Sequence, residues 1–216
     1  MKSLFLFFIT IGIGFAIGYS LAPSSMKSPI SSDEKDIANG SKNFFSLEQA
    51  PSKSLRGRLR SIVGDVKLQS RLATEPAALS SEAEILQGEA LATGEDGSLT
   101  VEFENGALLN ISAESHVDFV QTLPEHIVMI QKEGIVEYQP AKNSFLSVRS
   151  MHLLADITAG TYVTIEKDAE FLIFTVKKGS VNVAFNNLEN VTTKAIIAEG
   201  ETYIFNDDTR EGEITK

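Results

Sequence analysis

Glu102 and Glu104 are the carboxylates whose spacing could support catalysis, because they lie two residues apart. On a β-strand this spacing places both side chains on the same face. Two such carboxylates could act as acid and base on a glycan. The ordinary explanation, which we favour, is that they belong to the solvated face of an acidic protein. We therefore expect no catalytic residues and predict that the protein is not an enzyme.

Three histidines, His116, His126 and His152, are the remaining candidate bases or metal ligands. No two of them have the H-x-H or H-x-x-x-H spacing that would place a metal-binding pair on one element. The chain has no cysteine, which excludes a thiolate metal site, a thiol nucleophile and a disulfide. Phosphate-binding glycine loops and the Gly-x-Ser-x-Gly motif are also absent. We expect neither a metal nor a cofactor.

Arg56, Arg58 and Arg60 alternate with Gly57 and Leu59. On a strand, the three guanidinium groups would share one face. That face could bind an acidic polymer, lipid head groups or the carboxylates of a partner. Edge strands also carry such charges simply to block aggregation. The three arginines are thus the candidate partner-binding face, with a purely protective role as the alternative.

The composition places these residues in a folded, acidic protein. The chain has 216 residues, of which 43% are hydrophobic and 22% charged, as in globular domains. Its net charge is −10. Because such a protein repels the phosphates of nucleic acids, we expect no nucleic-acid partner.

An uncharged apolar run extends from Leu4 to Ala22. As a helix it would span about 28 Å, close to the thickness of a bilayer core. We predict that residues 1–22 form a retained transmembrane anchor. A cleaved signal peptide is the alternative, since Ser20–Ala22 loosely resembles a cleavage site. Lys2 before the run and acidic residues after it favour a single-pass protein of the inner or cytoplasmic membrane, with the remainder outside the cytoplasm.

The predicted anchor also carries Gly14 and Gly18. This small-xxx-small spacing lets two membrane helices approach closely, which would give a homodimer. Glycine is also common in membrane helices that do not pair. Beyond the anchor, residues 23–54 are rich in serine, proline and charged residues and predict a flexible linker.

From about residue 55 the pattern is that of β-structure. Leu99, Val101 and Phe103 alternate with polar residues, and Asn105-Gly106 follows as a tight-turn signal. Phe171–Val176 is apolar on both faces, as a central buried strand would be. Turn signals recur about every eight to twelve residues, which favours a sandwich, a barrel or a short solenoid. We predict an all-β domain of about ten to fourteen strands over residues 55–206, followed by a tail over residues 207–216.

A short unit recurs in this region, in which glycine is followed one residue later by valine in an alternating strand. It appears at Gly64, Gly134 and Gly179. Because the spacing between copies is uneven, we interpret it as repeated hairpin turns and not as a regular solenoid.

Several stretches resemble the FecR-like domain of bacterial envelope regulators. They are residues 62–66, 86–107, 134–137, 159–165, 178–181 and 198–201. The block over residues 86–107 is the most specific, with Thr-Gly, an acidic-Gly turn, a strand and a second polar-Gly turn. The resemblance implies an extracytoplasmic β domain beyond one membrane helix, which takes part in signalling. Only Met1–Ser3 precede the apolar run, so we expect no cytoplasmic sigma-factor-binding region.

We therefore predict a non-enzymatic, membrane-anchored, extracytoplasmic FecR-like domain protein that binds an envelope protein or a cell-wall polymer. The alternative is a transmembrane signalling component that relays an envelope signal through a partner.

Overall fold

The computed structural model describes residues 53–79 and 83–216, which form strands and no helix. The all-β prediction is confirmed for these residues. No helix among them could cross a membrane. The predicted anchor (residues 1–22) with its Gly14 and Gly18, and the predicted linker up to residue 52, lie outside the described residues.

The described residues form seventeen strands, more than the ten to fourteen predicted. The strands are β1 (Gly57–Val63), β2 (Val66–Gln69), β3 (Ala77–Ala78), β4 (Glu84–Ile85), β5 (Ala90–Thr93), β6 (Ser98–Phe103), β7 (Leu108–Ile111), β8 (His116–Thr122), β9 (His126–Gln139), β10 (Phe145–Ser150), β11 (Leu153–Ile157), β12 (Tyr162–Lys167), β13 (Phe171–Lys178), β14 (Ser180–Asn186), β15 (Thr192–Ala198), β16 (Thr202–Asn206) and β17 (Glu211–Thr215). Two of the strands, β3 and β4, have only two residues, too few to show alternation. Another, β17, lies in the segment expected to be a tail.

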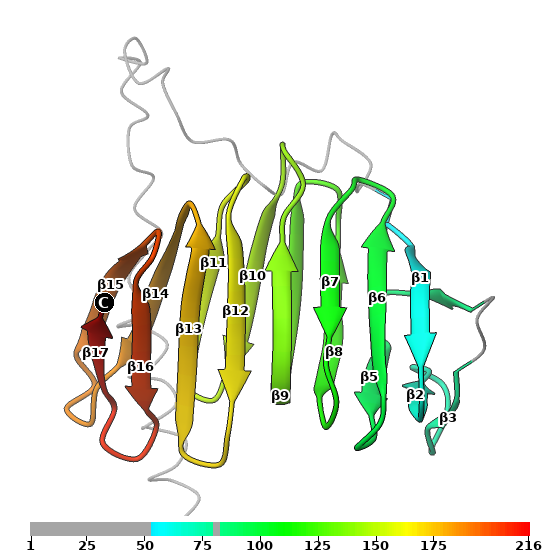
Figure 1. Cartoon of the computed structure of the whole chain (residues 1–216), viewed down its shortest axis with the longest axis horizontal. Helices are drawn as coiled ribbons and strands as arrows, with labels where there is room; N and C mark the ends of the chain where they lie inside the picture. The colour runs from blue at the N-terminus through cyan, green and yellow to red at the C-terminus, as the bar shows by residue number, and fades with distance from the viewer. Residues whose placement is uncertain (1–52, 80–82) are drawn as a thin grey trace, which may run out of the picture. The chain divides into compact units, whose positions relative to one another are not determined.

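The strands pair into one continuous sheet that is folded into two layers (Figure 1). The front layer has the order β4-β1-β6-β7-β9-β12-β13-β16-β17. The back layer has the order β3-β2-β5-β8-β9-β10-β11-β14-β15. Every pairing is antiparallel except that of β9 with β10.

Strand β9 belongs to both layers. Its first part pairs with β8 and β10, and its second part, from Gly134, pairs with β7 and β12. At the crossing Gly134 has a φ of +80°, and a Cβ there would clash with Ser115. Only glycine therefore suits this position.

The recurring glycine unit marks passages between the layers and not hairpin turns. The chain leaves the front layer at Gly64 between β1 and β2 and at Gly179 between β13 and β14, and it enters the front layer at Gly134. All three glycines have positive φ. The hairpin interpretation was wrong because a layer crossing and a hairpin both need a left-handed residue next to an alternating strand. Asn105-Gly106, by contrast, does form the predicted hairpin between β6 and β7.

The core lies between the two layers. Leu99, Val101 and Phe103 are buried, so the predicted inner face of β6 is confirmed. The prediction for Phe171–Val176 was wrong, because this strand buries only alternate residues and leaves Phe171 38% exposed. The reason is that the front of this layer faces away from the core, with no further layer of described residues over it.

Candidate functional site

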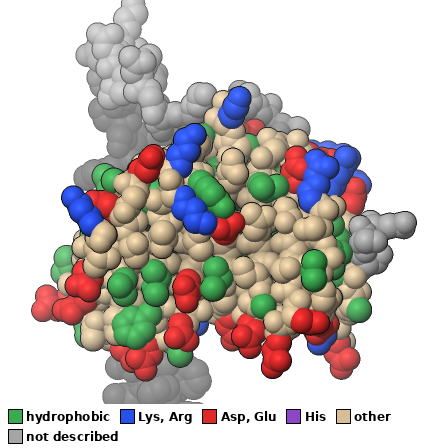
Figure 2. Space-filling model, viewed as in Figure 1, with side chains coloured by type: hydrophobic (Ala, Val, Ile, Leu, Met, Phe, Trp, Pro, Cys, Tyr) green, Lys and Arg blue, Asp and Glu red, His purple; other side chains and the backbone are tan. Residues whose placement is uncertain are grey.

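The three predicted arginines lie on or just before β1, at one end of the sandwich, where Figure 2 shows basic and acidic side chains gathered together. All three are exposed. Arg56 forms a 2.7 Å ion pair with Glu84, and Arg60 pairs with Glu102. In the part of the chain that the structure describes, Arg58 has no direct partner. This internal pairing leaves fewer free guanidinium groups on the face, and β1 lies between β4 and β6 at Gly57 and Arg58. Partner binding and edge protection both stay predictions for the three arginines.

The candidate catalytic groups do not converge. Glu102 is held by Arg60, which lowers the pKa of its carboxyl, whereas Glu104 lies in the turn after β6. The three histidines lie apart, and each contacts a neighbouring side chain: His116 contacts Asp118, His126 contacts Ser147, and His152 contacts Asp207. Within residues 53–79 and 83–216, no three acidic or histidine side chains are placed to hold a metal ion.

A polar row crosses the outer face of the front layer and was not found from the sequence. It comprises Thr100, Asn110, Glu137, Tyr162 and Lys177. Thr100 donates to Asn110 (2.9 Å), and Asn110 donates to Glu137 (3.1 Å). Glu137 also accepts from Tyr162 (2.7 Å) and Lys177 (2.5 Å), and the Lys177 ammonium lies 4.7 Å from the centre of the Tyr162 ring.

The side chains of the polar row form their hydrogen bonds with one another. The hydrogen bond from Lys177 is the main cause of a lowered pKa of Glu137, while Glu137 raises the pKa values of Lys177 and Tyr162. Both carboxylate oxygens of Glu137 are already engaged, so the row has little capacity left for a ligand. We interpret it as cross-strand stabilisation of the sheet.

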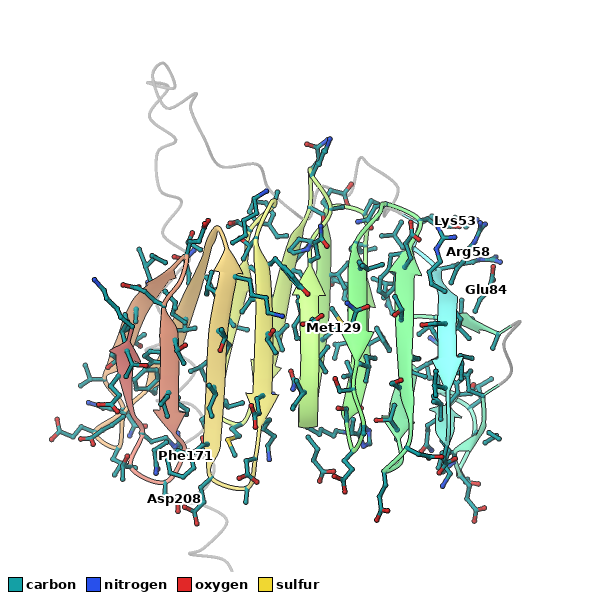
Figure 3. The ribbon with its side chains drawn as sticks, in the orientation of Figure 1. Lys53, Arg58, Glu84, Met129, Phe171 and Asp208 are labelled. Atoms are coloured by element: carbon teal, nitrogen blue, oxygen red, sulfur yellow. The ribbon has the colours of Figure 1, made fainter. Side chains whose placement is uncertain are left out.

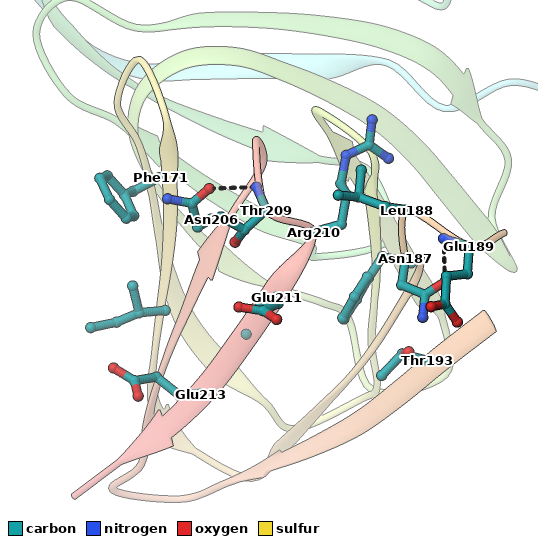
Figure 4. A pocket seen from close by; sticks show the side chains of 13 residues that line it. Phe171, Asn187, Leu188, Glu189, Thr193, Asn206, Thr209, Arg210, Glu211 and Glu213 are labelled. Atoms are coloured by element: carbon teal, nitrogen blue, oxygen red, sulfur yellow. Dashed lines mark hydrogen bonds between the residues drawn. The ribbon is translucent and has the colours of Figure 1, made fainter. Parts of the chain in front are cut away.

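A groove of about 800 Å³ opens at the opposite end of the sandwich, between the turns and edges of β13 to β17 (Figure 4). Figure 3 shows the separation, with Arg58 and Glu84 at one end and Phe171 and Asp208 at the other. The groove is lined by Phe171, Phe185, Asn187, Leu188, Glu189, Thr193, Ile204, Asn206, Thr209, Arg210, Glu211, Gly212 and Glu213. It is the strongest candidate for a functional site.

One wall of the groove is the turn between β14 and β15. The side-chain oxygen of Asn187 accepts hydrogen bonds from the backbone N–H groups of Glu189 (3.0 Å) and Val191 (2.9 Å). Asn190 takes a left-handed conformation, which asparagine tolerates better than most residues. This fixed turn leaves Leu188 69% exposed at the rim.

The other wall is the turn between β16 and β17, and it is built in the same way. The side-chain oxygen of Asn206 accepts hydrogen bonds from the backbone N–H groups of Asp208 and Thr209, both at 2.9 Å. Arg210 donates to the backbone oxygen of Asp207 (2.7 Å) and lies 3.8 Å from its carboxylate. Arg210 is therefore already held by its own turn.

The floor of the groove is aromatic. Phe185 lines it and packs against Phe205 beneath, with the ring centres 4.7 Å apart, and both side chains are buried. Beside them β17 lies close to Tyr203, and a Cβ at Gly212 would clash with its hydroxyl. Burial raises the pKa of Tyr203.

The charge at the groove is negative. Glu189, Glu211 and Glu213 line it and are exposed, whereas the one cation lining it in the described part of the chain is Arg210. Exposed apolar side chains, Leu188 and Phe171, lie among these acids. Apolar contact area and free strand edges are means by which proteins recognise other polypeptides, and charge of one sign adds specificity for a partner of the opposite sign.

The sequence held weak signals for this groove. Asn187 and Asn206 begin polar turns, and Glu211 and Glu213 alternate with Gly212 and Ile214. The second pattern resembles a polar tail in sequence, but these residues form β17, a strand at one wall of the groove.

No family model and no curated protein sequence matches the chain. The solved structures that resemble it include two crystal structures, both described as "a putative anti-sigma factor from Parabacteroides distasonis ATCC 8503", at 1.65 Å and 2.50 Å resolution. They are 12% and 13% identical to this chain, each with a TM-score of 0.50. The likeness covers 59% of this chain and 59% of each solved chain. At this identity it shows a shared fold, and the FecR-like resemblance drawn from the sequence stays a prediction.

Proposed function

We propose that this protein is a non-enzymatic binding module, held at the membrane by residues 1–22, which binds a partner protein outside the cytoplasm through the groove. The observation that carries the proposal is the groove itself. In the groove, exposed apolar side chains lie beside the strands β15 and β17. Each of these strands pairs with only one other strand among the described residues and so has a free edge.

The chemistry of the groove favours a protein over a cell-wall polymer. A free strand edge offers a row of backbone donors and acceptors, which another polypeptide can match along its length. The exposed carboxylates Glu189, Glu211 and Glu213 would repel an acidic wall polymer. A polymer partner is the alternative outcome of the test below.

A role in transmembrane signalling is the second candidate function. It is supported by the fold shared with the two solved proteins, which are described as putative anti-sigma factors. In this role the groove would receive a partner carrying an envelope signal. Deleting the gene should then change the transcription of a defined set of envelope genes, and an unchanged transcript profile would count against signalling without affecting the binding role.

Photocross-linking in the source cells tests the binding function. A photoreactive residue at Leu188 lies on the groove rim, and one at Leu72, which is 90% exposed, is the matched control outside the groove. We expect a discrete protein adduct at Leu188 and none at Leu72. Adducts that lose mass on treatment with wall hydrolases and contain no second protein by mass spectrometry would favour a polymer, and no adduct at Leu188 would reject the proposal.

The membrane assignment needs its own test. A carboxyl-terminal tag should fractionate with the inner or cytoplasmic membrane and become protease-sensitive once the outside of that membrane is accessible. A tag found in the soluble fraction, or protected until the membrane is dissolved, would contradict this part of the proposal.

A further inference from the structure

Strand β17 has a free edge beside the groove. It pairs with β16 over residues 211–215, and no other strand in the described part of the chain pairs with it. All five of its residues are exposed. The edge therefore presents backbone N–H and C=O groups that an extended segment could satisfy by adding as the next strand.

The two faces of β17 differ in chemistry. Glu211 and Glu213 are register partners of the outer-face residues Asn206 and Ile204. Gly212 and Ile214 are register partners of the buried residues Phe205 and Tyr203, so they belong to the inner face. A strand added to β17 inherits this alternation, because successive side chains point to opposite faces.

The inner side chains of an added strand would enter the part of the groove that inner-face residues line. There they would meet the Phe185 floor and the exposed Leu188 on the opposite wall. These contacts suit aliphatic or aromatic side chains, which gain by leaving water.

The outer side chains of the added strand would stand beside Glu211 and Glu213. Opposite charges on neighbouring strands attract, so lysine or arginine suits these positions. Arg210 offers little competition because its guanidinium is held by Asp207. Resting on the proposed function, we infer that the partner contributes an extended segment in which basic and apolar residues alternate, bound as an added strand on β17.

A second copy of the chain fits this edge less well. Antiparallel pairing of two β17 strands about Glu213 would place the two Glu213 side chains directly opposite each other, which is unfavourable. The net charge of −10 adds repulsion at longer range. Acidic residues on the edge thus hinder self-association while they leave the strand open to a basic partner.

Strand β15, the edge of the back layer, is the competing edge. It carries the exposed Lys194, whose charge would repel a basic segment. The exposed Ile196 would also be left on its outer side, without acidic neighbours on its own strand. Charge therefore directs a basic segment to β17.

Peptide binding to the full chain in detergent tests this inference. The probe is Lys-Val-Lys-Ile-Lys-Val-Lys, and the control peptide replaces each lysine with glutamate. E211K/E213K should weaken binding of the basic probe about tenfold. E75K/E104K makes the same change in net charge at exposed sites outside the groove and should leave the affinity within about twofold.

Hydrogen exchange supplies the structural readout. The basic probe should slow exchange of the amides of residues 211–215 and leave those of residues 194–198 of β15 unchanged. Equal losses of affinity in the two double variants would indicate general charge attraction and overturn the inference. Slowed exchange only at another strand, or a stable dimer of the unliganded chain through β17, would also overturn it. A protein adduct at Leu188 with failure of these tests would reject strand addition alone, whereas loss of the adduct would reject the binding function.

Discussion

The hydroxyl of Tyr138 donates a 3.0 Å hydrogen bond to the side-chain oxygen of Gln131, and both side chains are fully buried. They lie on either side of the point where β9 passes between the layers. The Gln131 amide completes the arrangement by donating to the backbone oxygens of Gly134 (2.7 Å) and Ile165 (3.0 Å). These bonds leave no polar atom of the Gln131 side chain without a partner at the crossing.

Replacing Tyr138 with phenylalanine should destabilise the domain by about 1–3 kcal/mol, because it leaves the Gln131 oxygen buried without a donor. The free energy of unfolding from urea titrations measures this. Tyr203→Phe is the matched control, since its hydroxyl has no hydrogen-bond partner among the described residues, and it should change stability less. Equal stability of Tyr138→Phe and the wild type would show that the crossing does not depend on this bond.

Gly134→Ala should be much more damaging than Gly106→Ala. Both glycines have positive φ, so each substitution carries a backbone cost of about 1–2 kcal/mol. At Gly106 nothing lies within 4 Å of an added Cβ, whereas at Gly134 the Cβ would clash with Ser115. We expect a further loss of about 2 kcal/mol at Gly134. Similar unfolding midpoints for the two variants would contradict the close approach at the crossing.

Val101→Asp should prevent folding, because Val101 is fully buried on β6 and an unpaired carboxylate there is costly by several kcal/mol. Thr175→Asp is the control, since Thr175 is exposed on β13. Circular dichroism and thermal melts of the two variants provide the comparison. A normal melt for Val101→Asp would mean that the inner and outer faces are reversed.

The pair of Glu137 and Lys177 predicts a pH dependence of stability. The pKa of Glu137 is lowered from 4.5 in the folded state, chiefly by its hydrogen bond with Lys177. Its contribution is therefore complete above the unfolded pKa and is lost as the pH falls through the lower, folded pKa. The pKa of Lys177 is raised from 10.5, so its contribution is lost only as the pH rises through that higher value.

Lys177→Met should return the pKa of Glu137 toward 4.5 and reduce the loss of stability in acid. Carbon-detected NMR titration of the Glu137 carboxyl measures the pKa directly. Lys178→Met, which removes an exposed charge from the neighbouring position, is the control and should leave the titration unchanged. An unaltered Glu137 titration in Lys177→Met would rule out the pair as the cause.

Local patterns allowed part of this fold to be predicted. The alternation of Leu99, Val101 and Phe103 and the turn at Asn105-Gly106 depend on neighbouring residues only, and both were confirmed. The sharing of β9 between layers could not be predicted, because it depends on pairings with four other strands. A glycine with positive φ looks the same in sequence whether it serves a hairpin or a layer crossing.

The groove could not be predicted for a similar reason. Phe171 seemed suited to a buried strand, and its exposure depends on which layers cover β13. β17 is short and carries Gly212 among charged residues, so its pattern resembled a tail. The exposure of the three arginines followed from alternation, but their ion pairs with Glu84 and Glu102 required the pairing of β1 with β4 and β6.

The most direct test of the central claim is hydrogen exchange of the full chain with and without the partner captured at Leu188. We predict that the partner slows exchange in residues 186–193 and 211–215, which border the groove, and leaves residues 57–63 of β1 unchanged. Protection of β1 with no change at the groove would instead place the partner on the arginine face and contradict the proposed site.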